Sequence, residues 1–197
     1  MSSPLDRRSF LRASATLVVG GSLFMPSLAA QQATPAAPTP ANKRPPKPPA
    51  LPPDKVQAAV GQSHRSLENV MKLVGEIPLL ANACWDWGGG DFETPLQAAA
   101  HTGQREIAGY LLGQGARLDL YAAAMLGQLD FVKVVMSINP RAHEIPGPHG
   151  FTVLHCARQG GAEARPVHDW LLAQGVPDVT FRPLPYVWPT GTAPGAA

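Results

Sequence analysis

The sequence predicts an all-α fold in which about four helix-turn-helix units stack in a row, joined by β-hairpin loops. Residues 94–119 have the pattern of one complete unit, and similar patterns lie before and after it. The turn glycines Gly103, Gly127 and Gly161 are spaced by 24 and 34 residues. Repeats of this length are typical of units that cannot bury their apolar faces alone and therefore stack.

The unit at residues 94–119 begins with a helix start signal. Thr94 is expected to be the N-cap, whose hydroxyl accepts an unpaired backbone N–H, and Pro95 suits the first helical position. Gly103 ends this helix and lets the chain reverse, and Gly115 fits the left-handed residue that ends the second helix. The apolar face of the second helix consists of Ile107, Leu111 and Leu112.

The other units are predicted from the same features. The first opens near Lys55 without a Thr-Pro start, as expected at the end of a stack, where the outer face meets water. Asp119 takes the capping position in the third unit, and Pro166 is expected to begin the last helix of the fourth. The predicted inward face of the third unit's second helix consists of Phe131, Val134, Val135 and Ile138.

Hairpin loops are expected before the second and fourth units. Residues 84–93 contain three consecutive glycines, which suit a tight reversal, together with several large aromatic side chains. Residues 141–151 are the other candidate, with a Pro-Gly tip. The short spacing between Gly103 and Gly127 leaves only a few residues for a hairpin before the third unit.

Composition divides the chain into four parts. Nine of the 22 prolines lie between residues 34 and 53, and five more lie between residues 177 and 194. Such proline-rich segments do not bury a core. We therefore expect a signal peptide over residues 1–30 and a Pro/Ala-rich disordered linker over residues 31–54. A repeat domain is expected over residues 55–177, followed by a Pro-rich C-terminal tail over residues 178–197.

The leader resembles a twin-arginine export signal. Its motif residues are Arg7, Arg8, Phe10 and Leu11, followed by an apolar run and a small-residue cleavage site. The resemblance implies export in the folded state, most simply to a bacterial periplasm. The apolar run of 13 residues is shorter than the roughly 20 that span a bilayer. We therefore expect only transient membrane contact, with a retained anchor as the alternative.

The charge of the repeat domain argues against nucleic-acid binding. From Asp54 onward the chain carries ten Lys and Arg against thirteen Asp and Glu. A net acidic surface does not attract phosphate backbones.

The unit at residues 94–119 resembles the ankyrin repeat, whose signature is Thr-Pro-Leu-His-x-Ala-Ala with a Leu-Leu-x-x-Gly-Ala ending. Residues 152–157 are a near copy of the same signature, and His155 is expected to hydrogen-bond neighbouring turns. The resemblance implies a scaffold that binds a protein partner through hairpin tips and inner helices. The candidate contact residues are Trp85, Trp87, Phe92, Tyr121, Met125 and His149. The alternative for the two tryptophans is packing against Leu79 and Leu80.

Catalytic and cofactor-binding motifs are missing from the sequence. It contains no Gly-x-Ser-x-Gly, His-Glu-x-x-His, phosphate-binding glycine loop or Cys-x-x-Cys, so neither enzyme activity nor a cofactor is expected. His143, Glu144 and His149 share one loop, but their spacing matches no established metal site. Three alternative functions are considered. They are a metal-dependent enzyme at that loop, a purely structural spacer, and a periplasmic factor that protects or matures a redox enzyme.

The two cysteines are expected to remain unpaired with each other. Cys84 precedes the second unit and Cys156 lies in the fourth, so packed helices should hold them roughly 20 Å apart. A disulfide requires Cα atoms within about 7 Å. We therefore predict no internal disulfide Cys84–Cys156.

Overall fold

The computed structural model describes residues 47–184, so the predicted signal peptide, most of the linker and the end of the tail lie outside the described part. The described part contains eight α-helices. They are α1 (Pro53–Gln62), α2 (Leu67–Glu76), α3 (Pro95–His101), α4 (Arg105–Gly113), α5 (Leu120–Met125), α6 (Leu129–Ile138), α7 (Val153–Gln159) and α8 (Arg165–Ala173). The predicted mainly helical fold is confirmed, and none of these helices is long and apolar enough to cross a membrane.

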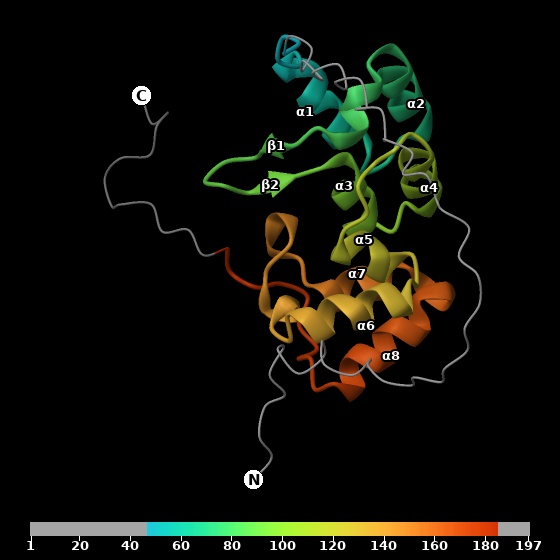
Figure 1. The fold of residues 1–197 in the computed structure, drawn as a ribbon, viewed down its shortest axis with the longest axis vertical. Coiled ribbons are helices and arrows are strands. Elements are labelled where there is room, and N and C mark those ends of the chain that lie inside the picture. Colours follow the sequence, from blue (N-terminus) through green and yellow to red (C-terminus); the bar gives the residue numbers. More distant parts are fainter. Residues whose placement is uncertain (1–46, 185–197) are drawn as a thin grey trace, which may run out of the picture. The chain divides into compact units, whose positions relative to one another are not determined.

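Helices that follow one another in the chain form pairs, and the pairs lie side by side (Figure 1). The first helices contact one another in chain order, α1 with α3, α3 with α5, and α5 with α7. The second helices contact as α2 with α4 and α6 with α8. Small side chains allow the close approach, because the alanines at 98–100 and 122–124 are fully buried.

The predicted helix caps are present. Thr94 Oγ1 accepts the Gln97 N–H at 3.2 Å, and the Gln97 side chain accepts the Thr94 N–H at 3.0 Å, which makes a capping box. Asp119 and Thr152 cap α5 and α7 in the same position. The first helix begins at Pro53, inside the segment predicted as linker, so the boundary of the folded domain lies earlier than predicted.

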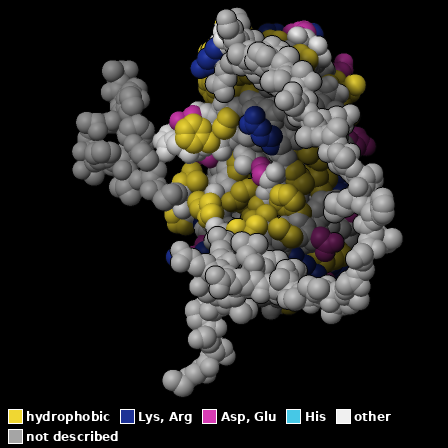
Figure 2. Space-filling view, in the orientation of Figure 1, with side chains coloured by type: hydrophobic (Ala, Val, Ile, Leu, Met, Phe, Trp, Pro, Cys, Tyr) yellow, Lys and Arg dark blue, Asp and Glu magenta, His cyan; other side chains and the backbone are white. Residues whose placement is uncertain are grey.

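The predicted inward face of α6 is only partly confirmed, because Val135 is half-buried against the core but the other three residues are exposed. Val134 and Ile138 are 57% and 79% exposed, whereas Val132 is fully buried. Seven of the ten positions of this helix are apolar, so periodicity alone fits more than one face. Contact with α5 and α8 selects the face of Val132. The exposed apolar side chains of α6 contribute to the hydrophobic surface of the molecule, and Figure 2 shows such side chains gathered across the middle of one face.

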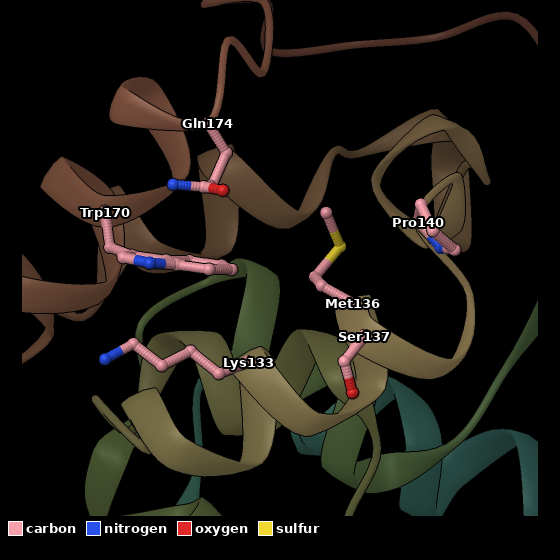
Figure 3. A pocket seen from close by; sticks show the side chains of 6 residues that line it. All are labelled: Lys133, Met136, Ser137, Pro140, Trp170 and Gln174. Carbon is pink, nitrogen blue, oxygen red and sulfur yellow. The ribbon is translucent and has the colours of Figure 1, made fainter. Parts of the chain in front are cut away.

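A groove between α6 and α8 carries further apolar surface. Lys133 and Met136 from α6 and Trp170 from α8 line this groove, whose volume is about 330 Å³ (Figure 3). It is completed by Ser137, Pro140 and Gln174.

The hairpin before the second unit forms as predicted. Strands β1 (Trp85–Asp86) and β2 (Phe92–Glu93) pair antiparallel, with Trp85 opposite Glu93. The glycines at 88–90 all have positive φ angles, between 65° and 127°, which other residues rarely adopt. The three glycines therefore make the tight reversal that the sequence indicated.

Residues 141–151 do not form the second predicted hairpin. They contain two short 3₁₀ turns, Ala142–Glu144 and Pro148–Gly150, and no strand pairs within them. Only six residues, 114–119, separate α4 from α5, so no hairpin intervenes before the third unit.

The loop at 141–151 contacts the β1–β2 hairpin, which it approaches from below in Figure 1. The His149 N–H donates to Asp91 Oδ1 at 2.8 Å. The Tyr121 hydroxyl donates to the carbonyl oxygen of Ile145 at 2.8 Å and holds the loop against α5. This junction of hairpin and loop positions the site described below.

The beginning of the tail packs over the fourth unit. The Thr152 hydroxyl donates to the carbonyl oxygen of Val179 at 2.6 Å, and Phe151 forms an isolated β-bridge with Phe181. The rings of the two phenylalanines lie 4.6 Å apart. Residues 179–182 thus belong to the folded body.

Candidate metal centre

Four side chains converge at the junction of the hairpin and the loop. His64, Glu93, His101 and His149 each offer one ligand atom, and these atoms all lie within 4.8 Å of one another. His64 lies in the turn after α1, Glu93 in β2, His101 at the end of α3, and His149 in the second 3₁₀ turn of the loop. The cluster therefore joins the first two helix pairs, the hairpin between them and the loop between the third and fourth pairs.

Glu93 is the acidic centre of the cluster and is fully buried. Its Oε1 lies 2.8 Å from His101 Nε2 and 3.5 Å from His64 Nε2. Its Oε2 accepts the indole N–H of Trp87 at 2.7 Å and lies 3.5 Å from His149 Nε2. Burial disfavours the charge, but hydrogen bonds with His101, His64 and Trp87 outweigh it and lower the pKa of Glu93 to about 2. The carboxylate is therefore ionised at neutral pH.

His64 is oriented by the end of α1. Its Nδ1 lies 3.1 Å from the carbonyl oxygen of Val60 and 3.2 Å from that of Gly61. A proton on Nδ1 donates to these carbonyls and leaves the Nε2 lone pair directed at the cluster. When Nε2 is also protonated it donates to Glu93, and this hydrogen bond raises the pKa of His64 against the opposing effect of burial.

His149 is held by Asp91 in an unusual backbone conformation. Its φ of 57° is the only positive value at a non-glycine residue in the described part of the chain. Asp91 accepts the backbone N–H at 2.8 Å, and its other oxygen lies 2.7 Å from His149 Nδ1. Histidines that bind a metal through one ring nitrogen usually donate the N–H of the other to a carboxylate or carbonyl oxygen. The contact between His149 Nδ1 and Asp91 fits this arrangement and leaves Nε2 free. Backbone strain of this kind is concentrated at functional sites.

His101 is the most buried of the histidines. Its Nε2 lies 3.2 Å from His64 Nε2 in addition to its contact with Glu93. Its ring stacks on Phe151 with centroids 4.6 Å apart. Its Nδ1 is buried without a hydrogen-bond partner, so packing rather than a second polar group orients this ring.

The spacing of the four groups fits a transition-metal ion. Donors bound at about 2.0–2.1 Å around a tetrahedral ion lie roughly 3.4 Å from one another. Glu93 Oε1 lies 2.8 Å from His101 Nε2 and 3.5 Å from His64 Nε2, and the two histidine nitrogens lie 3.2 Å apart, so these three contacts bracket this value. The ligand atom of His149 lies within 4.8 Å of the others. Three imidazoles and one carboxylate suit zinc, copper, nickel, cobalt or iron, whereas calcium and magnesium prefer oxygen ligands throughout.

The predicted metal alternative named the wrong partners for His149. His143 Nδ1 lies 3.0 Å from the carbonyl oxygen of Pro140, and Glu144 pairs with Arg141. Neither side chain belongs to the cluster that the described residues form.

The predicted protein-contact residues lie in different environments. Met125 is fully buried against neighbouring helices, so it is not available for surface contact and that prediction is corrected. Phe92 is 60% exposed, and Tyr121 and Trp85 are half-buried. Trp87 is 39% exposed, yet its indole N–H is committed to Glu93.

Sequence reasoning did not identify His64, Glu93, Asp91 or His101 as site residues. Asp91, Glu93 and His101 lie close together in the chain but match no established metal-binding motif, and His64 and His149 are distant in sequence. A usable signal was the position of His64 and His101 near the ends of the first helices of consecutive units, which stacking brings together. His155 was assigned correctly, since its Nε2 hydrogen-bonds to the carbonyl oxygen of His101 at 3.0 Å.

Both cysteines are free in the described part of the chain, Cys84 exposed and Cys156 buried. Burial raises the pKa of Cys156. Neither belongs to the four-residue cluster.

Short paired helices in contact, with a hairpin and turn glycines between them, make this a mainly helical protein that carries a candidate metal centre. The ankyrin repeat family model matches residues 91–121, which include β2, α3 and α4. Ankyrin repeats generally mediate protein–protein interaction, and the family typically provides non-enzymatic scaffolds. No curated protein and no solved structure matched the chain.

Replacing Asp91 with asparagine should weaken metal binding without abolishing it. The amide keeps the size of the side chain and removes the charge that orients His149. Loss of such a partner typically costs about 10–100-fold in metal affinity. Competition titration with a chelator would measure the change. Unchanged affinity would contradict the orienting role, and Asp86→Asn, which alters a nearby exposed hairpin carboxylate, is the matched control.

Metal affinity should fall as the pH is lowered through the raised pKa of His64, because protons and the metal compete for Nε2. In the metal-free chain, the contribution of His64 to folding stability should change with pH in the opposite direction. A histidine whose pKa is higher in the folded state stabilises the fold below its unfolded pKa of about 6.5, and this contribution is lost as the pH rises through the folded pKa. The lowered pKa of His155 changes the urea midpoint in the opposite sense, so the His64 contribution is measured as the difference in midpoint between the unaltered chain and a His64→Gln variant. That difference should decrease over the pH range in which metal affinity increases.

Proposed function

We propose that this protein binds one divalent first-row transition-metal ion through His64, Glu93, His101 and His149. The observation that carries the proposal is the convergence of four ligand atoms within 4.8 Å around a buried, ionised carboxylate. The backbone carbonyls behind His64 and the carboxylate behind His149 support the same function.

Metal stoichiometry tests this proposal. The full chain should be stripped with a chelator, incubated with Zn²⁺, freed of excess ion and analysed for bound metal. One equivalent is expected, together with a rise in the thermal midpoint, because an ion that binds only the folded state stabilises it. A chain that retains no zinc and shows no rise would refute the proposal.

A second candidate function, recognition of a protein partner, is favoured by exposed apolar residues beside the site. We propose that the four helix pairs form one ankyrin solenoid and that a partner docks at the junction of hairpin and loop. Phe92 and Ile145 are 60% and 53% exposed and line one cavity of about 240 Å³. Hydrophobic anchors of this kind supply much of the binding energy at interfaces.

Affinity capture from a periplasmic extract tests partner recognition. The Phe92→Ser, Ile145→Ser double variant should lose partners that the unaltered chain retains. Leu79→Ser is the control, because Leu79 is 64% exposed but lies outside the lining of that cavity. Equal capture by all three chains would contradict this docking site.

We propose, finally, that the protein is exported through a twin-arginine signal and receives its metal before export. The motif residues, Arg7, Arg8, Phe10 and Leu11, lie outside the described part of the chain. Export in the folded state would allow a metal site built from separate helix pairs to assemble first. The Arg7→Lys, Arg8→Lys variant should stay in the cytoplasm, and its appearance in the periplasm would contradict this pathway.

A further inference from the structure

We infer that the metal centre has an exchangeable coordination position, open between His64 and His149, which takes a small oxygen or nitrogen donor. This inference rests on the proposed metal function and extends it from holding an ion to binding a ligand on that ion. The ligand class is a small monodentate anion that displaces water.

The burial of the four side chains is uneven. The side chains of Glu93 and His101 are 0% and 6% exposed, whereas those of His64 and His149 are 23% and 32% exposed. The ion would therefore rest on a buried base formed by Glu93 and His101. His64 and His149 would flank the side that faces water.

The spacing of the rings is widest on that same side. The His64 and His101 centroids are 4.9 Å apart, and those of His101 and His149 are 5.4 Å apart. The centroids of the two exposed histidines, His64 and His149, are 6.2 Å apart. The widest gap between imidazoles thus coincides with the solvent-facing edge.

Glu93 leaves room for an additional ligand because its two oxygens face different groups. Oε1 lies closest to His101, whereas Oε2 is held by the Trp87 indole N–H at 2.7 Å. The carboxylate therefore favours monodentate binding, and the protein supplies four donors. Four protein donors complete a tetrahedral site, so a further ligand requires the ion to expand to five-coordination, and the open edge is where that fifth ligand would bind.

The surroundings limit the size of that ligand. The Trp87 ring lies beside both exposed histidines, with centroids 6.5 Å from His64 and 6.0 Å from His149. An ion of charge +2 near the carboxylates of Glu93 and Asp91 also leaves little net charge to attract a polyanion. A water-sized or linear triatomic donor matches this edge best.

Azide titration of the Co²⁺-loaded full chain tests the inference, because the visible bands of Co²⁺ respond to its ligands. Azide should change these bands saturably, with one azide per cobalt. The His143→Ala variant, which lacks a histidine outside the cluster, should behave in the same way.

Two results would overturn the inference, and they are distinguishable. Stoichiometric Co²⁺ with bands that azide leaves unchanged would show a closed site and leave the proposed metal function standing. If the full chain shows no Co²⁺ bands, or if the His64→Ala, His149→Ala variant shows the same bands, both the metal function and the open position are refuted.

Discussion

The His64→Ala, His149→Ala double variant should bind metal more than about 100-fold more weakly than the unaltered chain, because two of the four direct ligands are gone. Loss of a residue that only orients a ligand typically costs about 10–100-fold. These two histidines are the more exposed pair, so their removal should leave the helices folded. Chelator competition with Zn²⁺ measures the loss. Circular dichroism confirms that the variant retains its helices.

The matched control removes the same number of histidines from elsewhere. His143 contacts the carbonyl oxygen of Pro140, and His168 pairs with its neighbour Asp169. Neither belongs to the four-residue cluster. The His143→Ala, His168→Ala variant should keep the affinity of the unaltered chain. An equal loss in both double variants would indicate adventitious binding by surface histidines and contradict the site.

The Gly160→Ala variant should have a free energy of unfolding about 3 kcal/mol or more below that of the unaltered chain. Overpacking a core typically costs about 1–3 kcal/mol, so this variant is expected at or above the upper end of that range. Gly160 ends α7, and an added Cβ would lie 1.9 Å from the carbonyl oxygen of Met125 and 2.5 Å from Ala164 Cβ. Neither neighbour is a flexible side-chain end, so α5 and α7 would have to separate. Urea denaturation of the metal-free chain measures the change.

Gly109→Ala is the matched control for this variant. Gly109 lies inside α4, and an added Cβ would meet no atom within 4 Å. Alanine there should stabilise the chain by about 0.5–1 kcal/mol, because glycine loses more backbone entropy in a helix. A Gly160→Ala midpoint close to that of the unaltered chain would contradict the close approach of α5 and α7.

Local chemistry made the helical framework predictable. Thr94 and Asp119 are caps because their side-chain oxygens accept N–H groups that any helix start exposes. Gly103 and Gly127 mark turns because they take positive φ angles. These effects act within a few residues and can be recognised in the sequence.

The face of α6 and the conformation of residues 141–151 depend on neighbours that are distant in the sequence. Val132 is buried because of contact with α5 and α8, although Val134 and Ile138 are equally apolar. The loop takes 3₁₀ turns while it contacts Asp91 and Tyr121 instead of pairing with itself.

The candidate site was predicted least well, for the same reason. His149 was singled out as a contact residue, but its partners His64, Glu93 and His101 come from other units. The short connection between α4 and α5 was visible as the reduced spacing of Gly103 and Gly127. Its consequence, that the loop at 141–151 meets the β1–β2 hairpin, required coordinates.

X-ray absorption spectroscopy of the Zn²⁺-loaded full chain tests the metal centre most directly. The site predicts nitrogen and oxygen neighbours at about 2.0–2.2 Å with outer-shell scattering from three imidazoles. That scattering should decrease to one imidazole in the His64→Ala, His149→Ala variant. A sulfur neighbour at about 2.3 Å, which would implicate Cys84, or a shell of oxygen alone would contradict the assignment.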